Sequence, residues 1–297
     1  MHVLVTGGAG FIGRRLCSAL LARGNRVRVI DNFDDAYDPE LKHVPEGVEL
    51  IRGDCCDPAA VRLALDGVDA VAHLAARAGV RESIADPEAY GRNNVGATIT
   101  LLHAMREAGI RRMVFASSSS VYGAAGGPFR ECDPADRPAS PYAASKRAAE
   151  LFCVSSGLDV SACRLFTVYG PGQRPGMAIA KFARAIFANK PVTVYGDGSS
   201  LRDYTYVDDA VRGLVAAMDR ARGYNVYNIG CGQPIPLTEV LAALSDATRK
   251  RLKVNYSAPQ PGDVPLTHAD ITLAREQLGW APAVSFREGI ARYLASL

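Results

Sequence analysis

The stretch that decides the fold is Thr6-Gly7-Gly8-Ala9-Gly10-Phe11-Ile12-Gly13. It follows the apolar run Val3–Val5, which predicts a buried strand, and it opens the segment Phe11–Arg23, which has helical spacing. Glycines between a strand and a helix permit a tight turn, a close approach of the backbone to a ligand and close packing of the helix on the strand. The free N–H groups at the start of the helix attract negative charge. In this context the motif predicts a binding site for the pyrophosphate of a dinucleotide.

The rest of the first half alternates short apolar runs with helical patterns. The further predicted strands are Val27–Ile30, Glu49–Ile51, Ala70–Leu74, Met113–Ala116 and Val160–Arg164. The further predicted helices are Pro58–Leu65, Pro87–Ala108 and Pro141–Ser156. Strands that alternate with helices in this way predict an α/β protein with a Rossmann-type doubly wound parallel sheet and helices on both faces.

The composition of the sequence changes near Gly170. Glycine and proline cluster in residues 169–176 and again in residues 259–262. The predicted helices of this part are Ile179–Ala188, Val207–Arg220, Leu237–Thr248 and Phe286–Leu294. We therefore expect a dinucleotide-binding domain over residues 1–170, with returning segments near 205–230. We expect residues 171–297 mainly to form a smaller, mixed α/β lobe that binds the substrate.

Asp31 ends the second predicted strand, where a carboxylate can accept hydrogen bonds from both hydroxyls of an adenosine ribose. The same charge would repel a 2′-phosphate, which favours NAD over NADP. Arg14 and Arg15 lie nearby and favour NADP to a smaller degree, because an arginine can bind that phosphate.

Tyr142 and Lys146 stand one turn apart at the start of a predicted helix, so their side chains share one face. A tyrosine is a weak base at neutral pH, and a nearby ammonium group would lower its pKa. The serine run Ser117–Ser120 ends the fifth predicted strand, where a sheet of this kind places ligand-binding groups. Together these residues predict general acid–base catalysis at a hydroxyl-bearing carbon.

The spacing Gly7-x-x-Gly10-x-x-Gly13 and the Tyr-x-x-x-Lys pair resemble those of the extended short-chain dehydrogenase/reductase family. Further segments resemble this family in the same order along the chain, although Ala97 replaces a glycine of the family: Gly53-Asp54-Cys55, His73-Leu74-Ala75-Ala76 and Asn93-Asn94-Val95-Gly96-Ala97-Thr98. The resemblance implies catalysis by Ser118, Tyr142 and Lys146, with Ser119 and Ser120 as alternatives to Ser118. It also implies a tightly bound NAD, contacted by Gly7, Gly10, Phe11, Ile12, Gly13, Asp31, Asn32, Asp54, Cys55, Leu74, Ala75, Ala76, Asn93, Tyr142 and Lys146.

Several segments are similar to those of one subfamily, the UDP-glucuronate 4-epimerases. They are Ala78-Gly79-Val80-Arg81, Ser117–Gly123, Phe166–Pro171, Gln173-Arg174-Pro175 and Gln260–Pro265. UDP-glucose 4-epimerases typically carry Asn in place of Thr167 and Arg in place of Gln260. Sugar-nucleotide 4,6-dehydratases carry an Asp-Glu pair where this chain has Ser119 and Ser120, and decarboxylases usually carry a Glu there.

The resemblance therefore implies a 4-epimerase that interconverts UDP-glucuronate and UDP-galacturonate through a transient 4-keto sugar. Thr167 and Arg174, with Ser119 or Ser120, are expected to hold the sugar carboxylate, since arginine suits bidentate carboxylate binding. Other residues implied to contact the substrate are Arg81, Tyr195, Arg202 and Asp263. A UDP-glucose 4-epimerase or another nucleotide-sugar epimerase is the alternative, and a non-catalytic NAD-binding regulator is a more remote one.

Bulk properties narrow the classes of partner. The 297 residues carry a net charge of only +3, which gives no reason to expect nucleic acid as a partner. No apolar run is long enough to span a membrane, and the seven cysteines are typical of free thiols in a reducing cytoplasm. The histidines lack the spacing of a metal site, so no metal is expected. The family resemblance implies a homodimer formed by the helices at 87–108 and 141–156.

Overall fold

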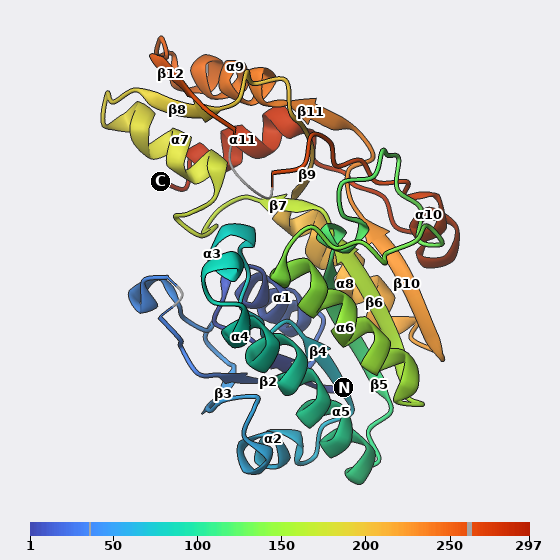
Figure 1. The fold of residues 1–297 in the computed structure, drawn as a ribbon. Helices are drawn as coiled ribbons and strands as arrows, with labels where there is room; N and C mark the ends of the chain where they lie inside the picture. The colour runs from blue at the N-terminus through green and yellow to red at the C-terminus, as the bar shows by residue number, and fades with distance from the viewer. Residues whose placement is uncertain (36, 260–262) are drawn as a thin grey trace.

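The computed structural model describes residues 1–35, 37–259 and 263–297. Figure 1 shows two lobes, a larger one built around a parallel sheet and a smaller one that lies beyond the carboxyl ends of the strands. The N-terminus begins an inner strand of the large sheet, whereas the C-terminus lies in the small lobe.

Seven strands of the described residues form the large sheet in the order β10-β6-β5-β4-β1-β2-β3, and every neighbouring pair is parallel. The strands are β1 (His2–Thr6), β2 (Arg26–Asp31), β3 (Glu49–Arg52), β4 (Ala70–His73), β5 (Arg112–Ser118), β6 (Asp159–Leu165) and β10 (Tyr224–Ile229). The chain order reverses at β1, which places β4 on one side of it and β2 on the other. The predicted Rossmann-type sheet is confirmed, and its switch point lies where the glycine turn leaves β1.

Helices cover both faces of this sheet. Figure 1 shows α5 and α6 in front of the strands and α1 and α8 behind them. The helices of the large lobe are α1 (Phe11–Ala22), α2 (Pro58–Leu65), α5 (Ala97–Glu107), α6 (Pro141–Ser155) and α8 (Val207–Asp219).

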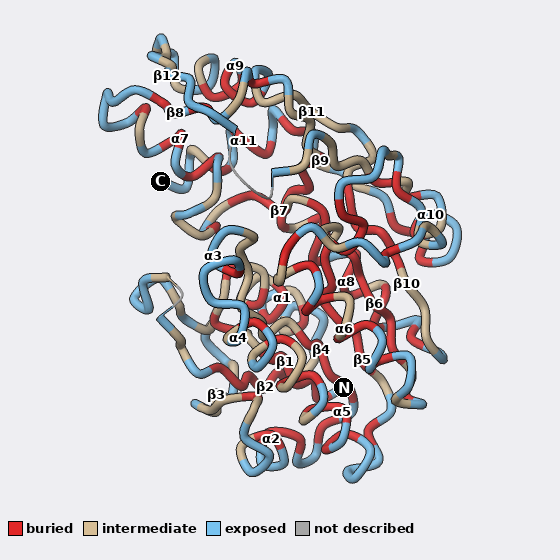
Figure 2. Tube along the Cα trace, in the orientation of Figure 1, coloured by how far each residue is buried: buried red, intermediate tan, exposed pale blue. Residues whose placement is uncertain are grey.

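The strand pleat divides the apolar side chains between two cores. Val3 and Val5 belong to the core on the side of α1 and α8, and Leu4 belongs to the core on the side of α2, α5 and α6. Strands that are buried on both faces have continuous apolar sequences, which is why these strands could be predicted from the sequence. Figure 2 shows the buried residues concentrated along them.

The small lobe contains two small sheets, β11-β9-β7 and β12-β8, together with four helices of the described chain. Its elements are β7 (Thr167–Tyr169), α7 (Ala178–Phe187), β8 (Val192–Tyr195), β9 (Leu201–Tyr206), β11 (Pro234–Pro236), α9 (Leu237–Thr248), β12 (Val254–Ser257), α10 (Thr272–Leu278) and α11 (Phe286–Leu294). The four helices predicted after residue 170 all occur, but α10 was not predicted.

The prediction of one continuous helix over Pro87–Ala108 is wrong in detail. The chain forms α3 (Val80–Ala85) and α4 (Pro87–Tyr90), then a π-helical segment η2 (Gly91–Gly96), and only then α5. The extra residue of a π-turn rotates the side chains that follow it, and such segments often occur at functional sites. Hydrophobic periodicity alone cannot show an insertion of this kind.

Candidate active site

The glycine turn adopts the geometry that its sequence predicts. Gly7 has φ of 69°, and a Cβ on it would lie 2.8 Å from the backbone of Ala75. A Cβ on Gly13 would lie 2.8 Å from the Cα of Gly8. Gly10 is the N-cap of α1 without a side-chain cap, and the first turn of α1 carries no acidic residue. The first N–H groups of the helix are therefore free to bind a phosphate.

Asp31 lies at the end of β2 beside this turn and is 9% exposed. Its carboxylate accepts hydrogen bonds from the N–H of Ala9 at 3.0 Å and from the N–H of Phe33 at 2.8 Å. Each carboxylate oxygen has a second lone pair, so both remain able to accept from ribose hydroxyls. The bonds fix the carboxylate against the glycine turn, and the residues present fit a dinucleotide.

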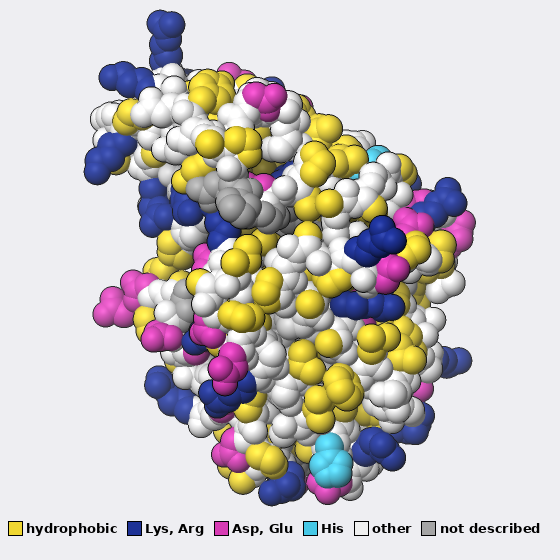
Figure 3. All heavy atoms as spheres, in the orientation of Figure 1, with side chains coloured by type: hydrophobic (Ala, Val, Ile, Leu, Met, Phe, Trp, Pro, Cys, Tyr) yellow, Lys and Arg dark blue, Asp and Glu magenta, His cyan; other side chains and the backbone are white. Residues whose placement is uncertain are grey.

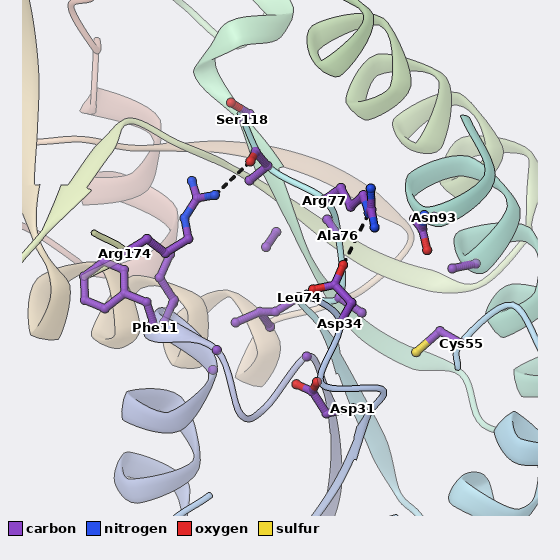
Figure 4. A pocket seen from close by; sticks show the side chains of 18 of the residues that line it. Phe11, Asp31, Asp34, Cys55, Leu74, Ala76, Arg77, Asn93, Ser118 and Arg174 are labelled. Atoms are coloured by element: carbon purple, nitrogen blue, oxygen red, sulfur yellow. Dashed lines mark hydrogen bonds and ion pairs between the residues drawn. The ribbon is translucent and has the colours of Figure 1, made fainter. Parts of the chain in front are cut away.

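A first cavity runs from the glycine turn to the end of β5, as Figure 4 shows from Asp31 to Ser118. Every residue predicted to contact NAD lines this cavity: Gly7, Gly10, Phe11, Ile12, Gly13, Asp31, Asn32, Asp54, Cys55, Leu74, Ala75, Ala76, Asn93, Tyr142 and Lys146. Ser118 and Arg174 line it as well. The structure thus brings the predicted cofactor and catalytic residues together in one space.

Tyr142 stands in the first turn of α6, whose N-cap Ser140 accepts from the N–H of Ala143. Burial raises the pKa of Tyr142 above its usual value, and this effect is partly opposed by a hydrogen bond from Ser118 and by the charge of Arg174. Ser118 is thus the serine that contacts the tyrosine.

Lys146 lies one turn after Tyr142 on α6 and contacts the strand beneath that helix. Its Nζ donates a hydrogen bond to the carbonyl oxygen of Ala116 on β5 at 2.8 Å and lies 5.1 Å from the centre of the Phe115 ring. Burial lowers the pKa of Lys146 to about 8, while the nearby Cys153 and Glu150 raise it. Helical spacing predicted that Lys146 shares a face with Tyr142, and the structure adds a hydrogen bond from its ammonium group to β5.

The pKa of Lys146 has a consequence for stability. The group binds more protons in the unfolded chain, where its pKa is about 10.5, than in the folded protein, so its contribution to stability grows as the pH rises above 8. Between pH 8 and 9.5 we expect the NAD-free protein to gain about 1.5 kcal/mol of unfolding free energy relative to Lys146→Met. Urea unfolding of both proteins at the two pH values measures this difference, and parallel pH profiles would contradict it.

A buried ion pair fixes α6 to the end of β5. Glu150, with no exposed surface, accepts from Arg164 at 2.9 and 3.0 Å and from the hydroxyl of Ser117 at 2.6 Å. Burial alone would raise the pKa of Glu150, but the hydrogen bonds and charge of Arg164 outweigh it, and the pKa is lowered. Both partners are therefore charged. Since Ser117 precedes Ser118, the pair also holds the serine that faces Tyr142.

A second cavity lies in the small lobe and shares Met177 with the first. It is lined by most of the predicted substrate residues: Arg81, Thr167, Tyr195, Arg202 and Asp263. Arg81 from α3 forms an ion pair with Asp263 at 3.2 Å and lies over the ring of Tyr195 at 5.1 Å. The predicted sugar and nucleotide residues therefore meet next to the predicted cofactor site.

Two predicted carboxylate ligands lie elsewhere than expected. The chain enters the 3-10 turn η3 (Ser119–Tyr122) directly after β5, so Ser119 and Ser120 leave the strand end and line neither cavity. Arg174 does reach the site: its Nη1 donates to the carbonyl oxygen of Ala78 at 2.8 Å, and Figure 4 shows the guanidinium turned toward Ser118. Gln260, whose identity favoured the acidic sugar, lies outside the described residues.

Sequence reasoning missed several residues of the two cavities. Asp34, Tyr37, Lys42 and Arg77 line the first, and Gln173 and Lys181 line the second. The segment between β2 and β3 carries neither a motif nor a hydrophobic period. Its charged residues were the only feature of the sequence that could have indicated a place in the site.

Histidines and acids do not form a metal site within the described residues, where no cluster of three or more possible ligands occurs. His73 is buried between Thr6 at 2.7 Å and Thr98 at 3.0 Å, and burial lowers its pKa to about 3. It is therefore a neutral packing residue at pH 7. No helix in the described part of the chain is long and apolar enough to cross a membrane.

Comparison with known proteins agrees with this geometry. The profile of the NAD dependent epimerase/dehydratase family matches residues 3–230, which is more than half of the chain. The chain belongs to this family. The match contains the glycine turn, Tyr142 and Lys146, and NAD is the cofactor of the family.

Individual relatives are similar over nearly the full length. The UDP-glucuronate 4-epimerase of Thermodesulfobacterium geofontis is 40% identical, and the alignment covers 98% of this chain and 94% of that protein. The structure of MoeE5 in complex with UDP-glucuronic acid and NAD is 40% identical, with a TM-score of 0.92 over 100% of this chain and 98% of that one. The UDP-glucuronic acid 4-epimerase from Bacillus cereus, in complex with UDP-glucuronic acid and NAD, is 34% identical, with a TM-score of 0.94 and the same coverage.

Proposed function

We propose that this chain is an NAD-dependent 4-epimerase that interconverts UDP-glucuronate and UDP-galacturonate. The observation that carries the proposal is the pair of adjoining cavities. The first contains Tyr142, Ser118 and the glycine turn, and it also contains the guanidinium of Arg174, a group suited to a carboxylate. The second offers arginines for a diphosphate beside it. The similarity to UDP-glucuronate 4-epimerases over nearly the whole chain supports the same substrate.

The chain's own residues manage the proton and the orientation of the sugar. Tyr142 takes the proton from the C4 hydroxyl, and Ser118, which contacts the tyrosine oxygen, steadies the charge that forms there. When bound, NAD supplies the acceptor of the C4 hydride, a positive charge near Tyr142, and the return of the hydride, so that no net oxidation results. The 4-keto sugar turns about its diphosphate link, and Tyr142 then returns the proton to the oxygen on the inverted carbon.

The substrate carboxylate makes the intermediate a β-keto acid, which can lose CO2. Loss requires the bond from C5 to the carboxylate carbon to stand perpendicular to the carbonyl plane. We propose that Arg174 holds the carboxylate out of that pose. The hydrogen bond to Ala78 anchors one side of its guanidinium, and within the described residues the other nitrogens have no hydrogen-bond partner.

A comparison of two substrates tests the proposed function. We expect kcat/KM for UDP-glucuronate to exceed that for UDP-glucose by at least about 100-fold, because charge-assisted hydrogen bonds to the carboxylate contribute about 3 kcal/mol. An equal or higher value for UDP-glucose would contradict the acidic substrate and favour the neutral-sugar epimerase.

We also propose that the two lobes bind different ligands. Residues 1–170, with the returning segments near 205–230, bind the cofactor, and residues 171–297 mainly bind the sugar nucleotide. The position of α8 and β10 on the large sheet supports the returning segments.

A homodimer is proposed through the exposed faces of α5 and α6. Four large apolar side chains there are between 40% and 53% exposed: Ile99, Leu151, Phe152 and Val154. Figure 3 shows hydrophobic side chains gathered over these two helices. Burial of such a face against a second copy supports a two-fold interface. Sedimentation equilibrium is expected to give the mass of two chains, and a monomer at micromolar concentration would contradict the proposal.

A cytoplasmic location is proposed on the state of the cysteines. All seven are free thiols in the structure, and four of them are buried in it. Thiols of this kind suit a reducing compartment.

A further inference from the structure

The segment that follows β2 forms part of the wall of the first cavity. Asp34, Tyr37 and Lys42 all line this cavity, although none lies in a strand or helix of the large sheet. Lys42 donates to the carboxylate of Asp34 at 2.7 Å and lies over the ring of Tyr37 at 4.6 Å. These contacts join the three residues to one another at the wall of the cavity.

Arg77 reaches this segment from the opposite side. It lies after β4, and its Nε is 3.3 Å from Oδ2 of Asp34, an ion pair that Figure 4 shows. Its terminal nitrogens lie 3.6 Å from Asp35 and 3.8 Å from Asp86. Arg77 is thus the centre of three ion pairs, and its side chain is 28% exposed.

The order of the strands places this bridge above the glycine turn. β4 and β2 flank β1 on opposite sides, and the turn leaves β1 between them. An ion pair between the segments that follow β4 and β2 therefore spans the cleft where the turn lies. In Figure 4, Asp34 and Arg77 point toward one another between Asp31 and Ser118.

Asn94 fixes the backbone that carries the bridge. Its amide accepts from the N–H of Arg77 at 2.8 Å and donates to the carbonyl of Arg77 at 2.9 Å, and it also donates to the hydroxyl of Ser145 on α6 at 2.9 Å. Asn94 is buried in the π-helical segment η2. One amide therefore links the arginine to the helix that carries Tyr142.

We propose that Arg77 and Asp34 form a latch that closes over the cofactor and slows the release of NAD. The inference rests on the family's use of NAD and deepens the proposed function, because an epimerase that regenerates NAD in each cycle gains from retaining it. The ion pair must open before Asp34 can move away from Arg77 and from the cavity. Both partners are partly exposed, so water hydrates the charges when the pair opens, and opening becomes faster as salt screens their attraction.

The test measures the release of NAD and requires no sugar nucleotide. Holoenzyme that carries radiolabelled NAD is mixed with excess unlabelled NAD, and the retained label is followed by rapid gel filtration. The variants are Arg77→Gln, Asp34→Asn and the double variant. Arg111→Gln is the matched control, because Arg111 forms a similar ion pair with Asp159 at 3.2 Å at the opposite end of the strands.

We expect each single variant to release NAD about 5-fold faster than the unchanged protein, as for the loss of an ion pair of about 1 kcal/mol. The double variant is expected to be no faster than Asp34→Asn alone, because that change already removes the ion pair with Arg77 as well as the one with Lys42. The control is expected to match the unchanged protein.

Two outcomes would overturn the latch. Release rates that are unchanged in both single variants would show that the ion pair does not limit the departure of NAD. Effects of the two changes that multiply in the double variant would show that each side chain acts on NAD separately. If the unchanged holoenzyme retains NAD but converts no sugar nucleotide, the proposed function fails while the latch stands.

Discussion

Tyr142→Phe is expected to lower kcat for UDP-glucuronate by about 10³-fold, because it removes the only hydroxyl proposed to accept the C4 proton. KM and NAD content are expected to change little. The ring keeps its edge-on packing against Tyr90 at 6.2 Å, so the fold is retained. Steady-state kinetics with purified protein, together with the absorbance of bound NAD, measure all three quantities.

Tyr90→Phe is the matched control for this change. Tyr90 packs against Tyr142 and is buried, but it lines neither cavity. Its variant is expected to retain most of the activity. A Tyr142→Phe protein within about 10-fold of the unchanged kcat would show that another group handles the proton.

Arg174→Ala is expected to turn the enzyme partly into a decarboxylase. Without the guanidinium, the carboxylate of the 4-keto intermediate can reach the pose from which CO2 leaves, and a 4-keto pentose should accumulate. We also expect KM for UDP-glucuronate to rise about 100-fold, since a charge-assisted bidentate contact is lost. Trapping of labelled CO2 from carboxyl-labelled substrate measures the first effect.

The same variant should change the pH profile in a defined direction. Burial raises the pKa of Tyr142, and the charge of Arg174 opposes that effect. Removal of this charge is therefore expected to shift the acid limb of kcat/KM toward higher pH. Arg174→Lys keeps the positive charge but loses the bidentate geometry of the guanidinium. We expect it to leave the acid limb of kcat/KM at the same pH and to weaken binding of the carboxylate. Unchanged CO2 release and unchanged KM in Arg174→Ala would contradict the proposed role.

The parts of the site that follow local patterns were predictable from the sequence. The glycine turn and Asp31 depend on a strand, a turn and a helix that are contiguous in the chain, and all of the predicted cofactor residues line one cavity. Tyr142 and Lys146 follow helical spacing, and the serine run follows the end of a strand. In each case the pattern that points to the residue lies within one strand, turn or helix.

Features that depend on contacts between distant segments could not be predicted. The bond from Lys146 to Ala116 joins a helix to a strand 30 residues earlier, and the ion pair between Arg77 and Asp34 joins two loops without periodicity. The turn that carries Ser119 away from the cavity depends on the chain's path after β5. The π-helical segment likewise leaves no trace in hydrophobic spacing.

The most direct test of the account is proton NMR of the purified holoenzyme with UDP-glucuronate and no added NAD. The account predicts that UDP-galacturonate appears and that the mixture reaches an equilibrium of the two sugars, because bound NAD returns the hydride that it takes. UDP-glucuronate that stays unchanged even after NAD is added, while UDP-glucose is converted to UDP-galactose, would contradict the account.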